Sequence, residues 1–250
     1  MKKKTLVYPL VTFIAILMIW EMLVSIGGIP LYILPAPSKI MKTLFENRWV
    51  LAMHGVVTLT EATIGLVIAS ILAFGMALIM DASQTIKFSI YPHFVVSQTI
   101  PVMILGPLFS IWLGFGMAPK IVMVILMCFF PMVVSFSDAL GKVEVAQLNL
   151  LKTFGASKGQ LYRLVKIPAA IGGFFSGLRV AATYCIGGAI VGEWLNASAG
   201  LGYYMIRVKN GYMLDKVFAC VVVIILLSLF MNGVVKLLEK LVYLKRGKRI

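Results

Sequence analysis

Long runs of apolar residues, broken by short polar segments, make up most of this sequence. A helix needs about 20 mainly apolar residues to cross the roughly 30 Å hydrocarbon core of a membrane, because it rises about 1.5 Å per residue. The pattern predicts six such helices. They cover about Leu6–Ile26, Ala62–Met80, Pro92–Leu113, Ile121–Ser137, Ile171–Gly192 and Val217–Val235. The sequence therefore predicts an all-α polytopic membrane protein with six transmembrane helices.

The third of these helices is expected to be irregular. The stretch from Phe88 to Pro119 carries no Lys, Arg, Asp or Glu, is too long for one straight helix, and is punctuated by prolines. Proline removes a helical hydrogen bond and bends the helix. We therefore expect a span from about Pro92 to Leu113, kinked at proline and followed by a turn at 114–116.

The basic residues predict the orientation of the helices. With the N-terminus inside, the inner segments hold 15 of the 23 Lys and Arg residues and the outer segments hold seven. Basic residues collect on the cytoplasmic side of membrane proteins. We therefore expect both termini in the cytoplasm, in agreement with an even number of spans.

Composition removes other classes of protein. The chain is 61% hydrophobic and only 13% charged, about half of the roughly 25% typical of soluble domains. These values exclude a soluble enzyme, a disordered chain and a disulfide-rich secreted module. The net charge of +14 would also suit nucleic acid, but the basic residues lie mainly between apolar runs. We expect no nucleic-acid partner, and interpret the charge as anchoring at the lipid surface.

No metal or cofactor is expected. The three cysteines fall inside apolar runs, and they show neither a pairing pattern nor the spacing of metal ligands. His93 has no neighbouring ligand in the sequence and is interpreted as structural or interfacial.

The segment between the fourth and fifth spans, Asp138–Ala170, is too long for a plain connector. Apolar residues recur in it at helical spacing, at Val143, Ala146, Leu150 and Phe154. Gly155 then suits the left-handed conformation that ends a helix. The pattern predicts a short amphipathic helix that stops at Gly155.

A second short helix is expected directly after this bend. Ser157 followed three residues later by Gln160 is the pattern of a capping box. Pro168 either stops this helix or begins the fifth span. Two amphipathic helices on the inner membrane face would either lie on lipid or dock to a cytoplasmic partner, and the pattern alone leaves both open.

The run from Gly155 to Pro168 resembles the signature of permease subunits of bacterial ABC importers, E-A-A-x3-G-x9-I-x-L-P. Gly155 is followed by nine residues and then by Val165-Lys166-Ile167-Pro168, at the spacing of the signature. Gly155-Ala156-Ser157 is also the usual run of the family at the bend. The front half departs from the signature, since Asn149-Leu150-Leu151 stands where Glu-Ala-Ala is expected.

Shorter runs extend the resemblance over almost the whole chain. They are similar to the subfamily that imports nitrate, sulfonates, taurine and thiamine pyrimidine precursors. These runs are Trp20-Glu21, Leu34-Pro35-Ala36-Pro37-Ser38, Gln98-Thr99-Ile100-Pro101, Gly106-Pro107-Leu108, Trp112 through Gly116 followed by Lys120, Gly177-Leu178-Arg179, Gly192-Glu193-Trp194 and Gly200-Leu201-Gly202-Tyr203. Each run alone is weak evidence, whereas their order and spacing together are strong.

The resemblance implies the MetI-like fold of type I importer permeases. The whole chain, 1–250, would be a single transmembrane domain, with a permease core at about 57–240, a first span and outer loop at 1–56, and a coupling segment at 138–170. Two permease copies, expected to form a homodimer, would line the path for a small polar nutrient. Two cytoplasmic ATPase subunits and an extracytoplasmic binding protein would complete the transporter in the bacterial inner membrane.

The resemblance also implies residues for docking the ATPase. These are Asn149, Lys152, Phe154, Gly155, Ala156, Ser157, Gln160 and Pro168. The chain has no Gly-x-x-x-x-Gly-Lys-[Ser/Thr] phosphate loop. It is therefore expected to be a transport subunit and not an enzyme, with ATP hydrolysed by a separate partner.

Polar residues within the spans are candidates for the transport path, since such groups usually face the bundle interior or water. Gln98 and Thr99 precede Pro101 and would line the pore or serve helix packing. Arg179 would either reach the inner surface or face the pore and attract an anion. A sulfonate or nitrate would suit a pore arginine, whereas a pyrimidine would not need one.

Acidic residues near the span ends have two interpretations. Glu193 and Trp194 end the fifth span on its outer side and would act as an interfacial anchor or, by the family pattern, as a gate. Glu61 and Asp138 lie at span ends and are expected to be exposed to water, with a role in the pore as the alternative.

Two other functions remain as alternatives. An ion-coupled secondary transporter would need a relay of mid-membrane carboxylates, which the uncharged cores of the second, fourth and sixth spans do not offer. A membrane enzyme would need His, Asp or Cys gathered at one membrane face, but the two His and nine acidic residues are scattered.

Overall fold

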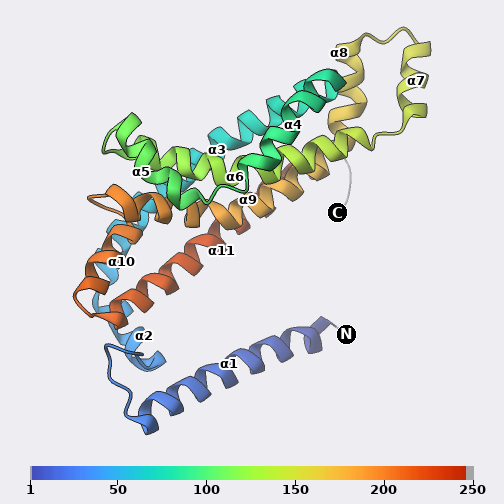
Figure 1. The fold of residues 1–250 in the computed structure, drawn as a ribbon. Coiled ribbons are helices and arrows are strands. Elements are labelled where there is room, and N and C mark those ends of the chain that lie inside the picture. Colours follow the sequence, from blue (N-terminus) through green and yellow to red (C-terminus); the bar gives the residue numbers. More distant parts are fainter. Residues whose placement is uncertain (1, 246–250) are drawn as a thin grey trace.

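The computed structural model describes the backbone of residues 2–245, and these form helices with no strand among them (Figure 1). Side chains are described from residue 7 to residue 244, apart from residue 196. The basic positions 246, 248 and 249, which entered the predicted inner-face count, lie outside the described residues. The elements are α1 (Lys2–Gly27), α2 (Pro37–Glu46), α3 (Arg48–Ala82), α4 (Gln84–Ser97), α5 (Val102–Leu113), α6 (Met117–Gly141), α7 (Val145–Thr153), α8 (Lys158–Leu161), the π-helical turn η1 (Tyr162–Lys166), α9 (Ile167–Asn196), α10 (Leu201–Asn210) and α11 (Leu214–Lys245).

Five of the described helical segments are long and apolar enough to cross a membrane. They are Val7–Gly27, Arg48–Ala82, Met117–Gly141, Lys158–Leu195 and Leu214–Leu244. Together with a sixth crossing made by α4 and α5, they confirm the predicted all-α polytopic fold. Most are longer than the apolar core that the sequence indicates, because helices extend past the membrane core into polar residues.

The third predicted span is two helices and not one kinked helix. The axes of α4 and α5 are bent by 101° at the break between them. Pro92 and Pro107 lie inside the two helices, so neither makes the sharp bend. The break falls just before Pro101, because a residue that precedes proline is disfavoured from the helical conformation.

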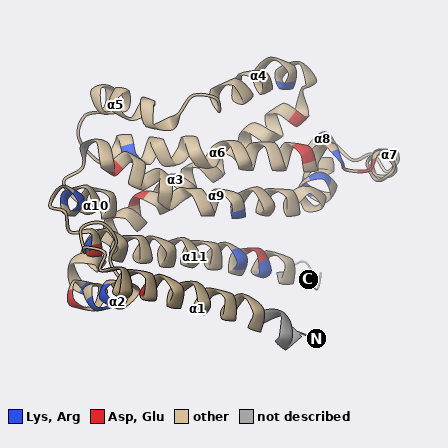
Figure 2. Cartoon of the chain, turned by 60° about the horizontal axis from the view of Figure 1, so that its bottom comes forward, with Lys and Arg blue, Asp and Glu red and all other residues tan. Residues whose placement is uncertain are grey.

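The α4–α5 pair runs from one end of the molecule to the other. It begins directly after α3, whose end contacts η1 through Asp81. It ends directly before α6, whose first turns contact α3 through Lys120 at the opposite end of the molecule. Figures 1 and 2 show the same course, with α4 near α8 and α5 near α10. The pair therefore behaves as one broken span, which brings the number of crossings to six.

The core lies where α3, α6 and α9 pack side by side (Figure 1). Fully buried alanines line the inner face of α3 at four-residue intervals, at Ala69, Ala73 and Ala77. On α9, a Cβ atom at Gly177 would lie 2.7 Å from the Cα atom of Met132 on α6. Small residues let helix backbones approach closely, which is how helices gain packing energy in lipid.

The first helix lies apart from this core (Figure 1). Trp20 packs edge-on against Phe218 of α11, with ring centroids 5.6 Å apart. Glu21 accepts hydrogen bonds from the backbone nitrogen and the hydroxyl of Ser38, at 2.9 and 2.7 Å. Ser38 is in the first turn of α2, so the Glu21 carboxylate caps that helix.

The two described chain ends lie at the same end of the molecule as α7 and α8. Figures 1 and 2 both show the start of α1 and the end of α11 on that side, with α2, α5 and α10 at the opposite end. This arrangement is the one expected if the termini and the segment 138–170 share one side of the membrane. We call the end with α7 the coupling end and the end with α10 the far end.

Candidate functional site

The coupling segment contains the predicted helix, bend and capping box. α7 ends at Thr153, and Gly155 follows with a positive φ of 79°, a conformation that glycine adopts without a Cβ penalty. The backbone nitrogen of Ser157 donates to Gln160 Oε1 at 2.7 Å, and the Gln160 nitrogen donates to Ser157 Oγ at 3.4 Å. These local predictions from sequence are confirmed.

The second helix of the segment differs from the prediction. It does not stop as a short separate helix, because α8 continues through the π-helical turn η1 into α9. Pro168 is the second residue of α9 and directly follows η1, whose π-helical turn interrupts the regular α-helical hydrogen-bond pattern. It therefore begins the fifth span, one of the two possibilities predicted from sequence. The coupling segment is therefore the extended end of the fifth span.

The predicted docking residues form an exposed surface at the tip of this extension. Figures 1 and 2 show α7 projecting beyond the rest of the molecule. Phe154 is 80% exposed and Leu150 61%, although both are apolar. Asn149, Lys152, Gly155, Ser157 and Gln160 are also exposed, whereas Ala156 and Pro168 are partly buried.

Behind this surface, a polar contact joins η1 to the coupling end of α3. Asp81 Oδ2 accepts a hydrogen bond from the Tyr162 hydroxyl at 2.6 Å and one from Lys166 Nζ at 2.5 Å. Tyr162 and Lys166 are four residues apart and share one face of the helix. Sequence reasoning missed this contact, because its members lie about 80 residues apart along the chain.

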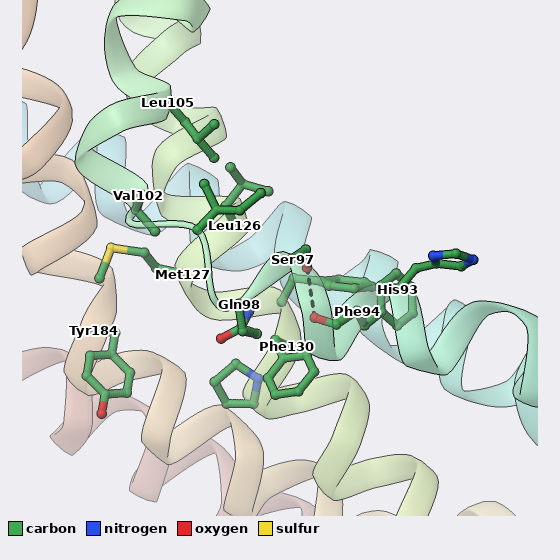
Figure 3. Close-up of a pocket in the computed structure, with 13 residues that line it drawn as sticks. His93, Phe94, Ser97, Gln98, Val102, Leu105, Leu126, Met127, Phe130 and Tyr184 are labelled. Carbon is green, nitrogen blue, oxygen red and sulfur yellow. Dashed lines mark hydrogen bonds between the residues drawn. The ribbon is translucent and has the colours of Figure 1, made fainter.

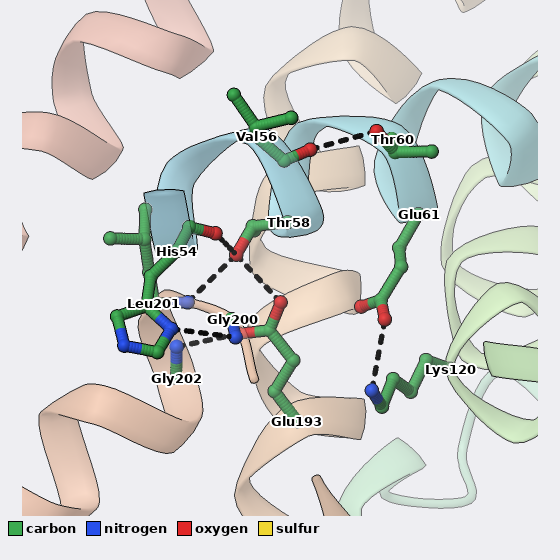
Figure 4. Close-up of polar contacts among 10 residues, drawn as sticks. All are labelled: His54, Val56, Thr58, Thr60, Glu61, Lys120, Glu193, Gly200, Leu201 and Gly202. Atoms are coloured by element: carbon green, nitrogen blue, oxygen red, sulfur yellow. Dashed lines mark hydrogen bonds and ion pairs between the residues drawn. The ribbon is translucent and has the colours of Figure 1, made fainter. Parts of the chain in front are cut away.

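At the far end, Glu193 is buried and holds the start of α10 (Figure 4). Its carboxylate accepts a hydrogen bond from Thr58 Oγ1 at 2.6 Å and one from the backbone nitrogen of Gly202 at 2.5 Å. Thr58 Oγ1 also accepts from the nitrogen of Leu201 at 2.8 Å. His54 Nδ1 accepts from the nitrogen of Gly200 at 3.1 Å. Side chains of α3 and α9 thus take up three backbone donors at the entry to α10.

Glu61 and Lys120 complete this far-end cluster. Lys120 Nζ of α6 lies 2.9 Å from Glu61 Oε1 of α3, and both side chains are buried. The expectation that Glu61 is exposed to water is wrong, since its side chain is buried. The helix α3 begins well before the predicted span, and it places Glu61 between α6 and α9. The second oxygen of Glu61 has no hydrogen-bond partner among the described residues, and the Glu193 carboxyl lies close enough to interact with it.

Trp194, which follows Glu193 at the end of α9, is 37% exposed. The two residues that sequence reasoning grouped together therefore occupy different surroundings. Glu193 joins three helices, whereas Trp194 lies at the surface. The far-end cluster comprises His54, Thr58, Glu61, Lys120 and Glu193, with the backbone of residues 200–202.

Replacing Gly200 by alanine is expected to destabilise the far end by about 2 kcal/mol, within the range of residues held in strained backbone conformations. Gly200 has a φ of 111°, and a Cβ atom there would clash with the carboxyl group of Glu193. Thermal unfolding of the purified protein measures the loss. Gly187→Ala is the matched control, because its Cβ would meet nothing within 4 Å inside α9. Equal melting temperatures for the two variants would contradict the role assigned to Gly200.

A cavity of about 630 Å³ lies among α4, α5, α6 and α9 (Figure 3). Gln98 lines it from the break between α4 and α5. Thr99 also lies in the break, outside the lining residues, and its hydroxyl donates to the carbonyl of Val96 at 2.7 Å. The sequence had indicated that both residues lie in the middle of a kinked helix. In the structure they lie instead in the break between α4 and α5. His93, interpreted from sequence as structural or interfacial, is among the lining residues, but its imidazole extends away from the other labelled side chains.

Arg179 of α9 is paired. Its Nη1 lies 3.1 Å from Glu239 Oε2 of α11, and its Nη2 donates to Ser176 Oγ at 3.2 Å. The Arg179 side chain is 41% exposed and that of Glu239 is 14% exposed. Neither residue lines the cavity. The sequence did not indicate this partner, because it is 60 residues away along the chain.

Comparison with known proteins agrees with these observations. Residues 65–242 match the family described as binding-protein-dependent transport system inner membrane component. A probable ABC transporter permease protein of Haemophilus influenzae is 39% identical over 91% of this chain and 93% of its own length. The formylaminopyrimidine transport permease protein ThiX of Halalkalibacterium halodurans is 34% identical over 96% of each chain.

A solved structure shares the fold. One chain of an amino acid ABC transporter crystallised with histidines superposes with a TM-score of 0.64 at 15% identity, over 79% of this chain and 96% of that chain. Both sequence relatives are named permeases, in agreement with the expectation of a transport subunit that is not itself an enzyme. The chain belongs to the family of inner membrane components of binding-protein-dependent transport systems, the permease subunits of ABC importers.

Proposed function

We propose that this chain forms the translocation path of an ATP-driven importer for a small polar nutrient. Two copies would line the path, two ATPase subunits would bind at the coupling end, and an extracytoplasmic binding protein would deliver the nutrient at the far end. The observation that carries the proposal is the exposed apolar surface of α7 beside the Gly155 bend. The chain belongs to the permease family, and its sequence has no phosphate loop, so a separate ATPase would have to bind at such a surface.

The coupling end is the cytoplasmic side in this proposal. The excess of basic residues in the inner segments supports it, since basic residues are retained in the cytoplasm. Phe154 and Leu150 would enter a groove of the ATPase, in the manner of an amphipathic helix that lies in a hydrophobic groove. Lys152 and Asn149 would contact the polar rim of that groove.

The continuous helix from Lys158 to Leu195 can transmit a movement of the ATPase subunits to the translocation path. It begins beside the docking surface and ends at the far-end cluster, so a displacement of its coupling end moves Glu193 as part of the same rigid element. Because α9 packs along α6, closure of the ATPases would shift both helices together. The path would then alternate between inward-facing and outward-facing states by rigid-body motion.

The nutrient belongs to the group formed by sulfonates, taurine, nitrate and thiamine pyrimidine precursors. The short runs that resemble this subfamily support the assignment, and one relative over almost the full chain is named for formylaminopyrimidine transport. Substrate choice would be shared between the binding protein and the path.

Replacing Gly155 by alanine is expected to weaken co-purification with the ATPase by about tenfold, which corresponds to about 1.4 kcal/mol. A side chain disfavours the left-handed conformation by roughly 1–2 kcal/mol, so the bend that presents α7 would change. The variant and the co-expressed ATPase are captured on a tag and quantified. ATP-dependent uptake into proteoliposomes is measured in parallel.

Gly159→Ala is the matched control for this experiment. Gly159 lies four residues away in α8, and a Cβ atom added at either glycine would meet nothing within 4 Å. Of the two, only Gly155 has a positive φ. If Gly155→Ala and Gly159→Ala co-purify equally and import equally, the docking proposal is wrong. If uptake in proteoliposomes requires an ion gradient and no ATP, the chain is instead an ion-coupled carrier.

A further inference from the structure

The cavity among α4, α5, α6 and α9 has a chemistry of its own. We propose that this cavity binds the transported molecule and that this molecule is an uncharged, flat aromatic heterocycle. Gln98 would form hydrogen bonds with the polar groups at the edge of the heterocycle. The inference rests on the proposed function and narrows it to one of the substrate classes. The cavity volume of about 630 Å³ falls within the roughly 300–1,000 Å³ of small-molecule sites.

Aromatic rings from three helices contribute to the lining, together with aliphatic side chains. Phe94 comes from α4, Phe129 and Phe130 from α6, and Tyr184 from α9. Phe94 and Phe129 already pack edge to face, with centroids 5.2 Å apart. Such rings bind another flat ring by stacking or edge contacts, which a small tetrahedral anion cannot make.

The lack of charged side chains among the described lining residues disfavours a bound anion more strongly than the shape of the cavity does. Among the described residues, those that line the cavity include no Lys, Arg, Asp or Glu. The closest cation along α9 is Arg179, five residues before Tyr184, and it is paired with Glu239. A sulfonate or nitrate ion in the cavity would lose water without gaining a partner charge, which is costly. An uncharged ring avoids that cost.

Gln98 supplies the polar group that a heterocycle needs. Its carboxamide carries two donors and an acceptor, which matches the ring nitrogens and amino groups of an aminopyrimidine. Figure 3 shows the side chain directed into the cavity from the α4–α5 break, with the oxygen on the side where Tyr184 lies. Gln98 is exposed, and no hydrogen bond to its carboxamide is found among the described residues, whereas the neighbouring Ser97 hydroxyl already donates to the carbonyl of Phe94 at 2.8 Å.

The break between α4 and α5 is what allows this arrangement. A continuous helix would turn Gln98 according to the helical period and would fill the space beside α6. The 101° bend instead separates the two halves and leaves the α6 rings accessible between them. The irregular third span is thus the element that makes the binding cavity.

The test uses the complete transporter, with ATPase and binding protein, in proteoliposomes. Uptake of radiolabelled formylaminopyrimidine is compared with uptake of taurine. Tyr184→Leu removes a ring, and Gln98→Glu adds a charge at constant shape. Gln84→Glu is the matched control, because it makes the same change at the exposed start of α4, away from the cavity. Binding of formylaminopyrimidine to the permease–ATPase complex alone is followed by saturation-transfer NMR.

We expect ATP-dependent uptake of formylaminopyrimidine but not of taurine. Tyr184→Leu and Gln98→Glu should each lower uptake and the NMR signal by about tenfold, roughly the loss of one good contact. The Gln84→Glu variant should match the wild type within about twofold in uptake, in the NMR signal and in basal ATP hydrolysis. Taurine uptake without formylaminopyrimidine uptake, or equal behaviour of Gln98→Glu and Gln84→Glu, would overturn the inference and leave the importer function standing. Absence of ATP-dependent uptake of either compound, together with loss of ATPase binding, would instead overturn the proposed function.

Discussion

Replacing Lys120 by methionine is expected to lower the free energy of unfolding by about 3–5 kcal/mol. The ammonium group of Lys120 is the cation that neutralises Glu61, and Glu61 is only 1% exposed. Without it, Glu61 would be left as a buried charge beside a second buried carboxyl, that of Glu193. Unfolding by denaturant in detergent measures the change.

The double variant Glu61→Gln with Lys120→Met separates charge from packing. It removes both charges and retains most of the volume, so its loss should be smaller than that of Lys120→Met by at least about 1.5 kcal/mol. Lys142→Met is the control, since Lys142 is exposed at the end of the same helix, and it should stay within about 0.5 kcal/mol of the wild type. If Lys120→Met alone were as stable as the wild type, the buried ion pair would not hold α3 to α6.

Local features of this fold were predictable from sequence. The apolar runs predicted the six crossings, because a membrane span is defined by about 20 residues in series. Gly155 and the Ser157–Gln160 capping box were predicted because each rule joins residues at most four positions apart. The end of the second coupling helix was left open by the sequence, since Pro168 is compatible with both the end and the first turn of a helix, and the structure places it at the start of α9.

Contacts between distant residues were not predictable in the same way. Glu61 was expected to be exposed to water at the end of a span. No residue near it in the sequence indicates that its partner is Lys120, 59 residues away. Arg179 was expected either to reach the inner surface or to face the pore, because nothing near it in the sequence indicates Glu239 as its partner. Gln98 and Thr99 are neighbours along the chain and were expected to share their surroundings, but the bend before Pro101 points only Gln98 into the cavity. Which side chains meet depends on how whole helices pack, and a single sequence does not show this.

Replacing Asp81 by alanine is expected to lower ATP-dependent uptake by about tenfold while basal ATP hydrolysis changes by less than about twofold. A coupling free energy of roughly 1–3 kcal/mol between two sites corresponds to such an effect. Asp81 is the contact through which η1, next to the docking surface, holds α3. In the proposed mechanism, α9 receives the displacement directly, and α3 follows through this carboxylate. Loss of the contact would loosen α3 from the coupling segment at the coupling end, although α3 would still pack on α6 and α9 in the core.

The charge-swapped variant Asp81→Lys with Lys166→Asp tests whether the contact itself matters. It rebuilds an ion pair between α3 and η1, and the Tyr162 hydroxyl can accept a hydrogen bond from the new lysine. Uptake should therefore recover to within about threefold of the wild type, a residual cost below about 1 kcal/mol. Asp138→Asn, an exposed carboxylate near the coupling end of α6, is the control and should import normally. Uptake per ATP hydrolysed is the deciding quantity, because misfolding lowers hydrolysis and uptake together whereas a broken transmission contact lowers uptake alone. An unchanged ratio in Asp81→Ala would mean that α9 moves the path without α3.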